Sequence, residues 1–411
     1  MASALSWLDY SEHERRQVLD IVELFRDRQT LDELGIGTVR DAFAELLFPG
    51  TSTIQTRAKY FLFIPWIYRD LERRRVPSHE IAKRARRNEI RLMNALKRAG
   101  ELDGLIGRVA GARIKRLASS IYWQGLGRWG IRLFPGSQDH YHRSIDAIYA
   151  AVRRATSRDD DGETTLSTRV PTWHADLPDP PDGFPERASF RLERHEAEYL
   201  RERLMSQVSD TMLARLVDLG RPVRDIEEPW LYPELDQLTP VMREQLEHAR
   251  NFSVVIYGAS LLYNRMLAEL VPQDELATAY GDVLNEWWSI AGELEQALLA
   301  WDRDRFWEIA LSGGARIPIP TRRFVDAWLD LSLDGLRRGV PAEAVWDTPR
   351  ARDLIHRRER ALKRGLARLD NRRALELWNG ASGTAPLTYR WGTVRQIVQD
   401  IIDGLAERSH A

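Results

Sequence analysis

The stretch TSTIQTRAKYFLFIPWIYRDLERRR, residues 51–75, decides the class of fold. Ser52 followed three positions later by Gln55 has the spacing of a capping box, which marks the start of a helix. The residues after it favour a long helix through Arg75, in which Pro65 would cause a kink because it lacks a backbone donor. Apolar residues recur at helical spacing along most of the chain, and no alternating strand pattern of useful length occurs. The sequence therefore predicts an all-α protein.

Further helices are predicted on both sides of this stretch, and one segment interrupts them. Ranges with helical spacing include 11–28, 38–47, 78–100, a segment from 137, and then 240–270, 274–300, 303–312, 321–338, 350–369 and 394–407. Residues 155–187 contain five prolines and many acidic residues, which is typical of a linker or a long surface loop. We therefore expect two helical domains, 1–154 and 188–411, joined by a Pro/Asp-rich linker at 155–187.

The composition excludes several classes of protein. The 411 residues include no cysteine, which rules out disulfide scaffolds, thiol catalysis, iron–sulfur clusters and cysteine-ligated zinc. The longest apolar stretches, 60–68 and 252–263, are far shorter than the ~20 residues that cross a bilayer. Charged residues follow the first methionine too soon for a signal peptide. We expect a cytoplasmic protein without membrane contact.

Charge is segregated along the chain, although the net charge is only −1. Residues 57–154 carry 22 basic and 8 acidic side chains, whereas residues 188–348 carry 17 basic and 28 acidic ones. A basic block of this size is typical of a surface that binds nucleic acid. The same block could instead dock on the acidic block of its own chain. The sequence leaves both interpretations open.

A helix–turn–helix-like segment suggests where nucleic acid would bind. Residues 38–47, the turn 48–51 and the helix from 52 have that order, and the second helix opens with hydroxyl, amide and basic side chains suited to phosphates and base edges. Arg57 could alternatively pair with Asp41 or Glu45. The candidate nucleic-acid-binding residues are Ser52, Gln55, Arg57, Lys59, Arg84, Arg86, Arg87, Lys115, Arg116, Trp123, Arg128 and Trp129.

The segment Gly125–Gly130, GLGRWG, matches G-x-G-x-x-G. A dinucleotide site would need a strand before it and a helix after it, but the lead-in SSIYWQ does not have the pattern of a strand, Trp129 would crowd the pyrophosphate, and Pro135 would end the helix almost at once. The segment is interpreted as a tight loop whose aromatic residues either stack on bases or fill the core. A short repeat flanks it, because LFPG-Thr at 47–51 recurs as LFPG-Ser at 133–137.

No other motif specifies an active site. Asp139, His140 and His142 lie in a predicted helix, where the two histidines would point about 200° apart, so no metal site is expected. Arg243 and His248 have the Arg-x4-His spacing of HEPN-type helical ribonucleases, although their acidic neighbours would repel a phosphate. Common nucleophile and P-loop motifs are absent. We expect no cofactor.

The stretch at 33–68, ELGIGTVRDAFAELLFPGTSTIQTRAKYFLFIPWIY, resembles a bacterial family of about this length that is known only as a domain of unknown function. Similar stretches continue at 121–132, 257–264, 306–310, 357–383 and 389–401, so the resemblance covers nearly the whole chain except 155–187. It implies a gene neighbourhood of anti-phage defence or mobile-element functions, beside helicases and nucleases. It implies no catalytic residue.

These observations lead to one functional hypothesis and two alternatives. The first is a non-catalytic accessory protein of a bacterial DNA-defence or DNA-processing system, which binds DNA or RNA through its N-terminal domain and another protein of the same operon through 188–348. The first alternative is a helical scaffold or protein-interaction module without nucleic-acid contact. The second is a HEPN-like ribonuclease that uses Arg243 and His248.

Overall fold

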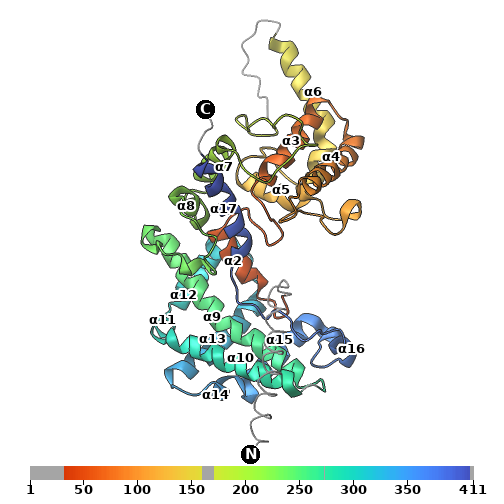
Figure 1. Cartoon of the computed structure of the whole chain (residues 1–411). Helices are drawn as coiled ribbons and strands as arrows, with labels where there is room; N and C mark the ends of the chain where they lie inside the picture. The colour runs from red at the N-terminus through yellow and green to blue at the C-terminus, as the bar shows by residue number, and fades with distance from the viewer. Residues whose placement is uncertain (1–31, 160–170, 273, 408–411) are drawn as a thin grey trace, which may run out of the picture. The chain divides into compact units, whose positions relative to one another are not determined.

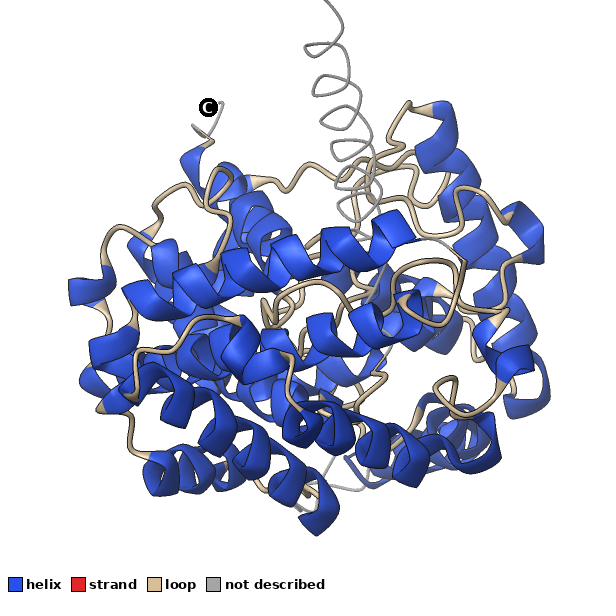
Figure 2. Cartoon of the chain, turned by 90° about the horizontal axis from the view of Figure 1, so that it is seen from below, coloured by secondary structure: helices blue, strands red, loops and turns tan. Residues whose placement is uncertain are grey.

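A computed structural model describes residues 32–159, 171–272 and 274–407 (Figure 1). Within these ranges helices and loops make up the fold, and the only β-type pairing is an isolated bridge between Arg132 and Trp173 (Figure 2). The predicted all-α class is therefore confirmed. The predicted helix at 11–28 lies outside the described residues.

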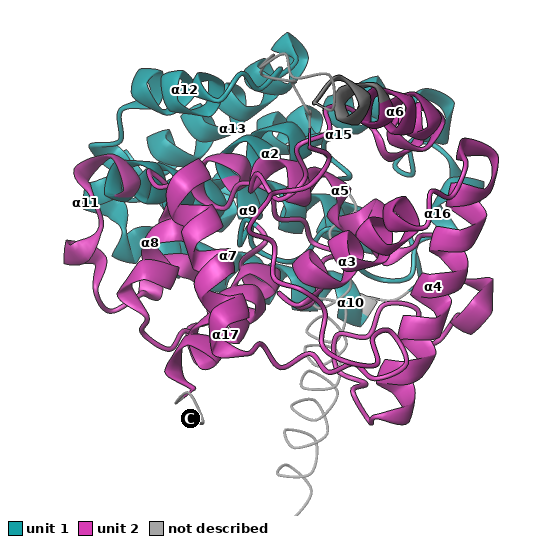
Figure 3. Cartoon of the chain, turned by 90° about the horizontal axis from the view of Figure 1, so that it is seen from above, with its two compact units in different colours: residues 1–43, 243–389 teal, residues 44–242, 390–411 magenta. Residues whose placement is uncertain are grey.

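The chain divides into two compact units, and each unit is discontinuous in sequence (Figure 3). Unit 1 consists of residues 1–43 and 243–389, and unit 2 of residues 44–242 and 390–411. The first two division points fall inside helices, in α2 (Gly37–Leu47) and in α9 (Pro240–Ala268). This division differs from the predicted one, because the predicted linker at 155–187 lies within unit 2.

Unit 2 contains two groups of packed helices. In the first, α3 (Tyr60–Arg73) packs on α4 (Ser78–Arg98) and α5 (Ala118–Arg128), and α4 packs on α6 (Gln138–Asp159). In the second, α17 (Trp391–Ala406) packs on α7 (Arg194–Gln207) and α8 (Met212–Leu219). The short 3-10 helices of this unit are η1 (Gly111–Arg113), η2 (Pro229–Leu231) and η3 (Leu235–Gln237).

The central helix of unit 2 is shorter than predicted, and this corrects the sequence analysis. Helix α3 begins at Tyr60, whereas residues 51–59 form turns and irregular structure. The expected capping pair closes a turn instead: the backbone N–H of Ser52 donates to Gln55 Oε1 at 3.2 Å, and Gln55 Nε2 donates to the carbonyl of Gly50 at 3.1 Å. Pro65 is accommodated inside α3, where every residue from Tyr60 to Tyr68 is buried.

The structure describes two parts of the predicted linker: residues 155–159 are the end of α6, and residues 171–187 pack against α3. Trp173 is buried, Trp66 Nε1 donates to the carbonyl of Pro178 at 2.6 Å, and Phe184 lies edge-on to the ring of Trp66 at 5.2 Å. These contacts make the segment a packed loop of unit 2.

Unit 1 is built around α9. Its other helices are α10 (Asp274–Glu293), α11 (Glu295–Leu299), α12 (Arg303–Ser312), α13 (Ile319–Arg337), α14 (Glu343–Trp346), α15 (Pro349–Lys363), η4 (Arg364–Leu366) and α16 (Arg372–Leu375). Two tryptophans bond to the α9 backbone: Trp287 Nε1 donates to Val254 O at 2.6 Å and Trp328 Nε1 to Val255 O at 2.8 Å. Gly258 allows this approach, because a Cβ there would collide with the Trp287 ring.

Candidate nucleic-acid interface

Helix α4 has one apolar face and one strongly basic face. Ile81, Ala85, Leu92 and Leu96 are buried and hold the helix on unit 2. Arginines at 84, 87, 91 and 98 are exposed on the other side, at spacings of three, four and seven residues that place them in one stripe. Lys83 and Lys97 are exposed beside this stripe.

A second basic segment is attached to α4. Arg86 Nη2 donates to the carbonyl of Ala112 at 2.9 Å and to that of Ile114 at 3.0 Å, so this predicted site residue fastens the loop 108–116 to the helix. Ile114 is buried and anchors the loop. The exposed basic residues of the loop and its end are Arg108, Arg113, Lys115 and Arg116.

Most of these charges lack an acidic partner. Arg84 Nε donates to Glu80 at 2.7 Å, and Arg91 forms an ion pair with Glu186. Eight exposed basic side chains form no ion pair among the described residues: Lys83, Arg87, Lys97, Arg98, Arg108, Arg113, Lys115 and Arg116. We call these eight residues the α4 basic surface. It includes the predicted site residues Arg87, Lys115 and Arg116.

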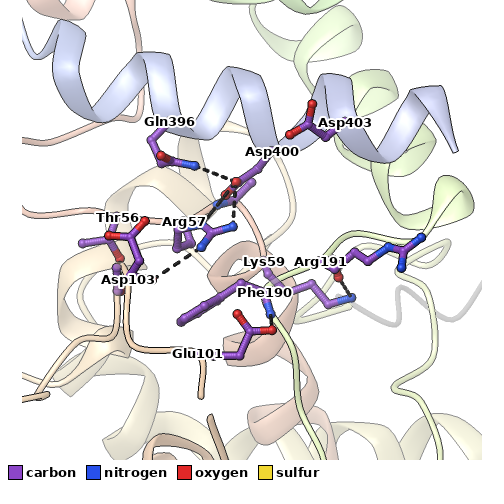
Figure 4. Close-up of polar contacts among 12 residues, drawn as sticks. Thr56, Arg57, Lys59, Glu101, Asp103, Phe190, Arg191, Gln396, Asp400 and Asp403 are labelled. Carbon is purple, nitrogen blue, oxygen red and sulfur yellow. Dashed lines mark hydrogen bonds and ion pairs between the residues drawn. The ribbon is translucent and has the colours of Figure 1, made fainter. Parts of the chain in front are cut away.

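Two other predicted site residues, Arg57 and Lys59, pair with carboxylates of unit 2 (Figure 4). Arg57 pairs with Asp400 rather than with Asp41 or Glu45: its Nε and Nη2 lie 2.9 Å from Asp400 Oδ2 and Oδ1. Lys59, 4% exposed, pairs with Glu196 and donates to Arg191 O at 3.0 Å.

The structure therefore does not present the expected recognition helix. Gln55 is buried, Lys59 and Arg57 are tied to carboxylates, and no helix begins at Ser52. Lys59 is thus neutralised by Glu196, which belongs to the acidic block 188–348, whereas Asp400, the partner of Arg57, lies outside that block. The residues of the α4 basic surface, in contrast, form no ion pair with acidic residues of the described chain.

The predicted aromatic residues fill the core of unit 2. Trp129 is fully buried, stacks on Phe61 with ring centroids 3.8 Å apart, and donates from Nε1 to Pro49 O at 3.0 Å. Trp123 is buried and donates to Gly136 O at 3.1 Å. Neither ring is accessible to a base. Arg128 is exposed, with Nε 3.5 Å from Glu45 Oε1.

Each glycine of the GLGRWG motif has a packing role. A Cβ at Gly125 would lie closer than 3.0 Å to the carbonyl oxygen of Gly50, and a Cβ at Gly127 would overlap the guanidinium of Arg132. Gly130 has a φ of +65°, a conformation that favours glycine, just after α5. The motif therefore lies at the end of a helix and not between a strand and a helix.

The Arg243 and His248 side chains do not share a surface. Arg243 is exposed on α9, whereas His248 is 7% exposed and accepts a hydrogen bond at Nδ1 from Trp301 Nε1 at 2.7 Å. Burial lowers the pKa of His248. Five positions on a helix correspond to about 140° of rotation, which accounts for the separation.

The model of a family of unknown function, DUF6361, matches residues 2–404. The chain belongs to this family. The predicted resemblance to an uncharacterised family is confirmed to that extent. No curated protein and no solved structure matches the chain.

The described part of this family member contains neither a cluster of metal-binding side chains nor a helix that could span a membrane. No group of three or more His, Asp or Glu side chains there is arranged to hold a metal ion. His142 Nε2 instead lies 3.0 Å from the hydroxyl of Tyr68. None of the helices in that part combines the length and the apolar character needed to cross a bilayer.

Five members of the α4 basic surface were not among the candidate residues, namely Lys83, Lys97, Arg98, Arg108 and Arg113. The signal for Arg98 was present, because it lies seven positions after Arg91 and so continues the stripe of arginines along the predicted helix 78–100. Arg108 had no local signal. It becomes part of the surface because the Arg86 hydrogen bonds attach its loop to α4.

Proposed function

We propose that this protein binds the phosphate backbone of nucleic acid through the α4 basic surface. The observation that supports this most directly is that eight exposed cations have no acidic partner among the described residues. Keeping like charges together costs electrostatic free energy, and polyanion binding recovers it through counterion release. Arginine and lysine are the side chains that most commonly contact phosphates.

The chemistry of this surface favours contact with the backbone and not with bases. Residues 76–117 contain no Phe, Trp or Tyr, so the surface offers no ring for stacking on an unpaired base. Duplex DNA carries about one charge per 1.7 Å of its axis, about twice the density along one strand. We therefore expect duplex to bind more tightly than a single strand, with little dependence on sequence.

In a cell, we propose an accessory role in a bacterial DNA-defence or DNA-processing system, in the cytoplasm. The family resemblance and its implied gene neighbourhood support this role. The expected contact of residues 188–348 with a partner protein remains a prediction. That range is divided between the two units, and several of its acidic residues, such as Glu196, Glu244 and Glu269, are already paired within their own unit.

A salt titration of the full-length protein tests the proposal. Labelled duplex DNA, single-stranded DNA and RNA are each titrated between 50 and 200 mM salt, and for duplex the slope of log K against log[salt] should be about −0.9 per phosphate contact. The test variant is Arg87→Glu/Lys115→Glu/Arg116→Glu. Losing three contacts should reduce the slope by about 2.7 and weaken binding at 0.1 M salt by more than about a hundredfold.

The matched control is Arg350→Glu/Arg360→Glu/Arg373→Glu. These three residues are exposed in unit 1 and form no ion pair among the described residues, so the control changes the net charge by the same amount. It should bind like the unmodified protein. An equal loss in both variants would mean that net charge alone drives binding, and no binding at low salt would reject the proposal.

A further inference from the structure

A pocket of about 540 Å³ lies in unit 2 beside the end of α5. Both copies of the short repeat line it: Gly50 and Thr51 from the first, and residues 133–136 from the second. The two copies of the repeat, which are far apart in sequence, thus contribute residues to the lining of the same pocket. The volume is within the range of small-molecule sites.

Three arginines and one acidic residue line this pocket. Glu45 Oε1 lies 3.5 Å from Arg128 Nε, and its Oε2 lies 3.3 Å from Arg390 Nη1. Arg390 Nη1 also donates to the carbonyl of Thr51 at 2.6 Å. The carboxylate of Glu45 is therefore shared by two arginines. With three arginines and one glutamate, the lining side chains carry a net charge of +2.

The third arginine, Arg132, is buried without an acidic partner. It is 7% exposed, its Nε donates to Trp123 O at 3.2 Å, and its Nη1 bonds to Phe134 O. The guanidinium carbon lies 4.8 Å from the Trp123 ring centroid. Carbonyls and a ring orient the cation, but no carboxylate among the described residues neutralises it. Burial lowers the pKa of Arg132, yet arginine stays protonated in proteins.

A second polar group on the same pocket is unsatisfied. The Ser52 hydroxyl is buried and has no hydrogen-bond partner among the described residues. Leaving a buried donor unpaired costs free energy, so such groups commonly mark a missing partner. Arg132 and Ser52 thus both belong to the lining of one cavity.

We propose that this pocket binds a phosphate monoester, with the phosphate at Arg132 and the remainder of a nucleotide-sized molecule filling the cavity. A guanidinium matches phosphate oxygens through paired hydrogen bonds. A phosphate monoester carries a charge of about −1.5 to −2 at pH 7, which balances the +2 of the lining, whereas a carboxylate carries −1. The inference is independent of the proposed nucleic-acid contact, because no residue of the α4 basic surface lines the pocket.

Gly127 explains why the pocket coincides with the glycine-rich motif. A Cβ at position 127 would overlap Arg132 Nη2, so glycine is needed for the guanidinium to keep its place. The glycines therefore position a cation, which differs from a dinucleotide fold, where they let the backbone approach the pyrophosphate.

The test is calorimetric titration of the full-length protein with inorganic phosphate, ribose 5-phosphate and adenosine monophosphate, with adenosine and citrate as controls. At least one phosphate compound should bind, and adenosine and citrate should bind at least about tenfold more weakly. An 8-mer oligonucleotide with a 5′-phosphate is compared with its 5′-hydroxyl form in the Arg87→Glu/Lys115→Glu/Arg116→Glu background. A preference for the phosphorylated form alone would identify a nucleic-acid end as the source of the phosphate.

Arg132→Gln should weaken phosphate binding by at least about tenfold. Because that side chain is buried, Arg128→Ala provides a variant at an exposed position and should weaken binding in the same direction. Arg143→Ala, on the exposed side of α6, is the control and should bind normally. The proposal is overturned if no phosphate compound binds, if citrate binds equally, or if Arg128→Ala binds like the unmodified protein.

Discussion

The carboxylate of Asp400 receives two 2.9 Å hydrogen bonds from Arg57, although 343 positions separate the two residues. Asp400 also accepts from the backbone N–H of Ala58 at 2.9 Å and from Gln396 Nε2 at 2.8 Å. The pair joins α17 to the segment before α3. A helix at the end of the described chain thus completes the region that begins at residue 44.

Replacing Asp400 with Ala should destabilise unit 2 by about 3–5 kcal/mol, because Arg57 would remain largely buried without its counter-charge. Asp403→Ala is the matched control, since its side chain is on the same helix, is 55% exposed and pairs with Arg224. It should change stability by less than about 0.5 kcal/mol. Urea unfolding of both variants measures this, and equal midpoints would contradict the assigned role of Asp400.

Glu89 should make stability depend on pH. It is buried, and burial raises its pKa to about 7, whereas an unfolded glutamate titrates near 4.3. Between these values the folded state keeps a proton that the unfolded state releases, so stability falls as pH rises through this window, by about 3 kcal/mol in total.

Glu89→Gln removes this titration while keeping an acceptor for the backbone N–H of Ser119, which donates to Glu89 at 2.9 Å. The variant should therefore be more stable than the unmodified protein at pH 8 and similar at pH 4. Thermal unfolding across this range provides the measurement. Glu80→Gln, at an exposed position, serves as the control. Parallel pH profiles for the unmodified protein and Glu89→Gln would count against the raised pKa.

Gly125→Ala should destabilise unit 2 by about 2 kcal/mol or more, because the new Cβ would meet the backbone oxygen of Gly50 closer than 3.0 Å and backbone must move. Gly392→Ala is the control in the same unit. Nothing lies within 4 Å of a Cβ at that helical position, so stability should stay the same or rise by up to about 1 kcal/mol. If both variants unfold at the same denaturant concentration, the close approach of Gly50 does not require glycine at position 125.

The ribonuclease alternative predicts that His248→Ala and Arg243→Ala both abolish RNA cleavage. From the structure we expect neither effect. His248→Ala should lower the melting temperature, because Trp301 loses its acceptor and a cavity opens, while Arg243→Ala should leave it unchanged. Incubating labelled RNA with each purified protein tests the catalytic point. Cleavage by the unmodified protein that disappears in both variants would restore the alternative.

Local sequence signals predicted the class of fold. They did not predict the start of α3 or the division into units, because contacts between distant residues determine both. Apolar spacing was sufficient for the helices, because amphipathic periodicity reflects burial directly. The start of α3 was displaced to Tyr60 because Ser52 and Gln55 close a turn. The division into units was missed, since contacts such as Arg57 with Asp400 leave no trace in neighbouring residues.

For the candidate site, too, local signals predicted some residues correctly, and non-local contacts explain the others. Arg87, Lys115 and Arg116 were predicted and are exposed, because a polar position on an amphipathic helix or in a loop faces solvent. Lys59 and Trp129 were also predicted but are buried, because the aromatic core of unit 2 includes their segments. Whether a basic residue next to an apolar run is on the surface depends on a carboxylate far away in sequence, here Glu196.

The discontinuity of the units has a consequence for synthesis. After residues 1–43, a ribosome makes residues 44–242 of unit 2 and then about 150 further residues of unit 1, all before the partner helix α17 exists. At about 5–20 residues per second, the interval is about 10–30 s. During it Arg57 and Lys59 are already present, but Arg57 lacks Asp400. Unit 1 has all its residues by position 389, so it can finish folding before unit 2, although residues 44–242 of unit 2 are made before most of unit 1.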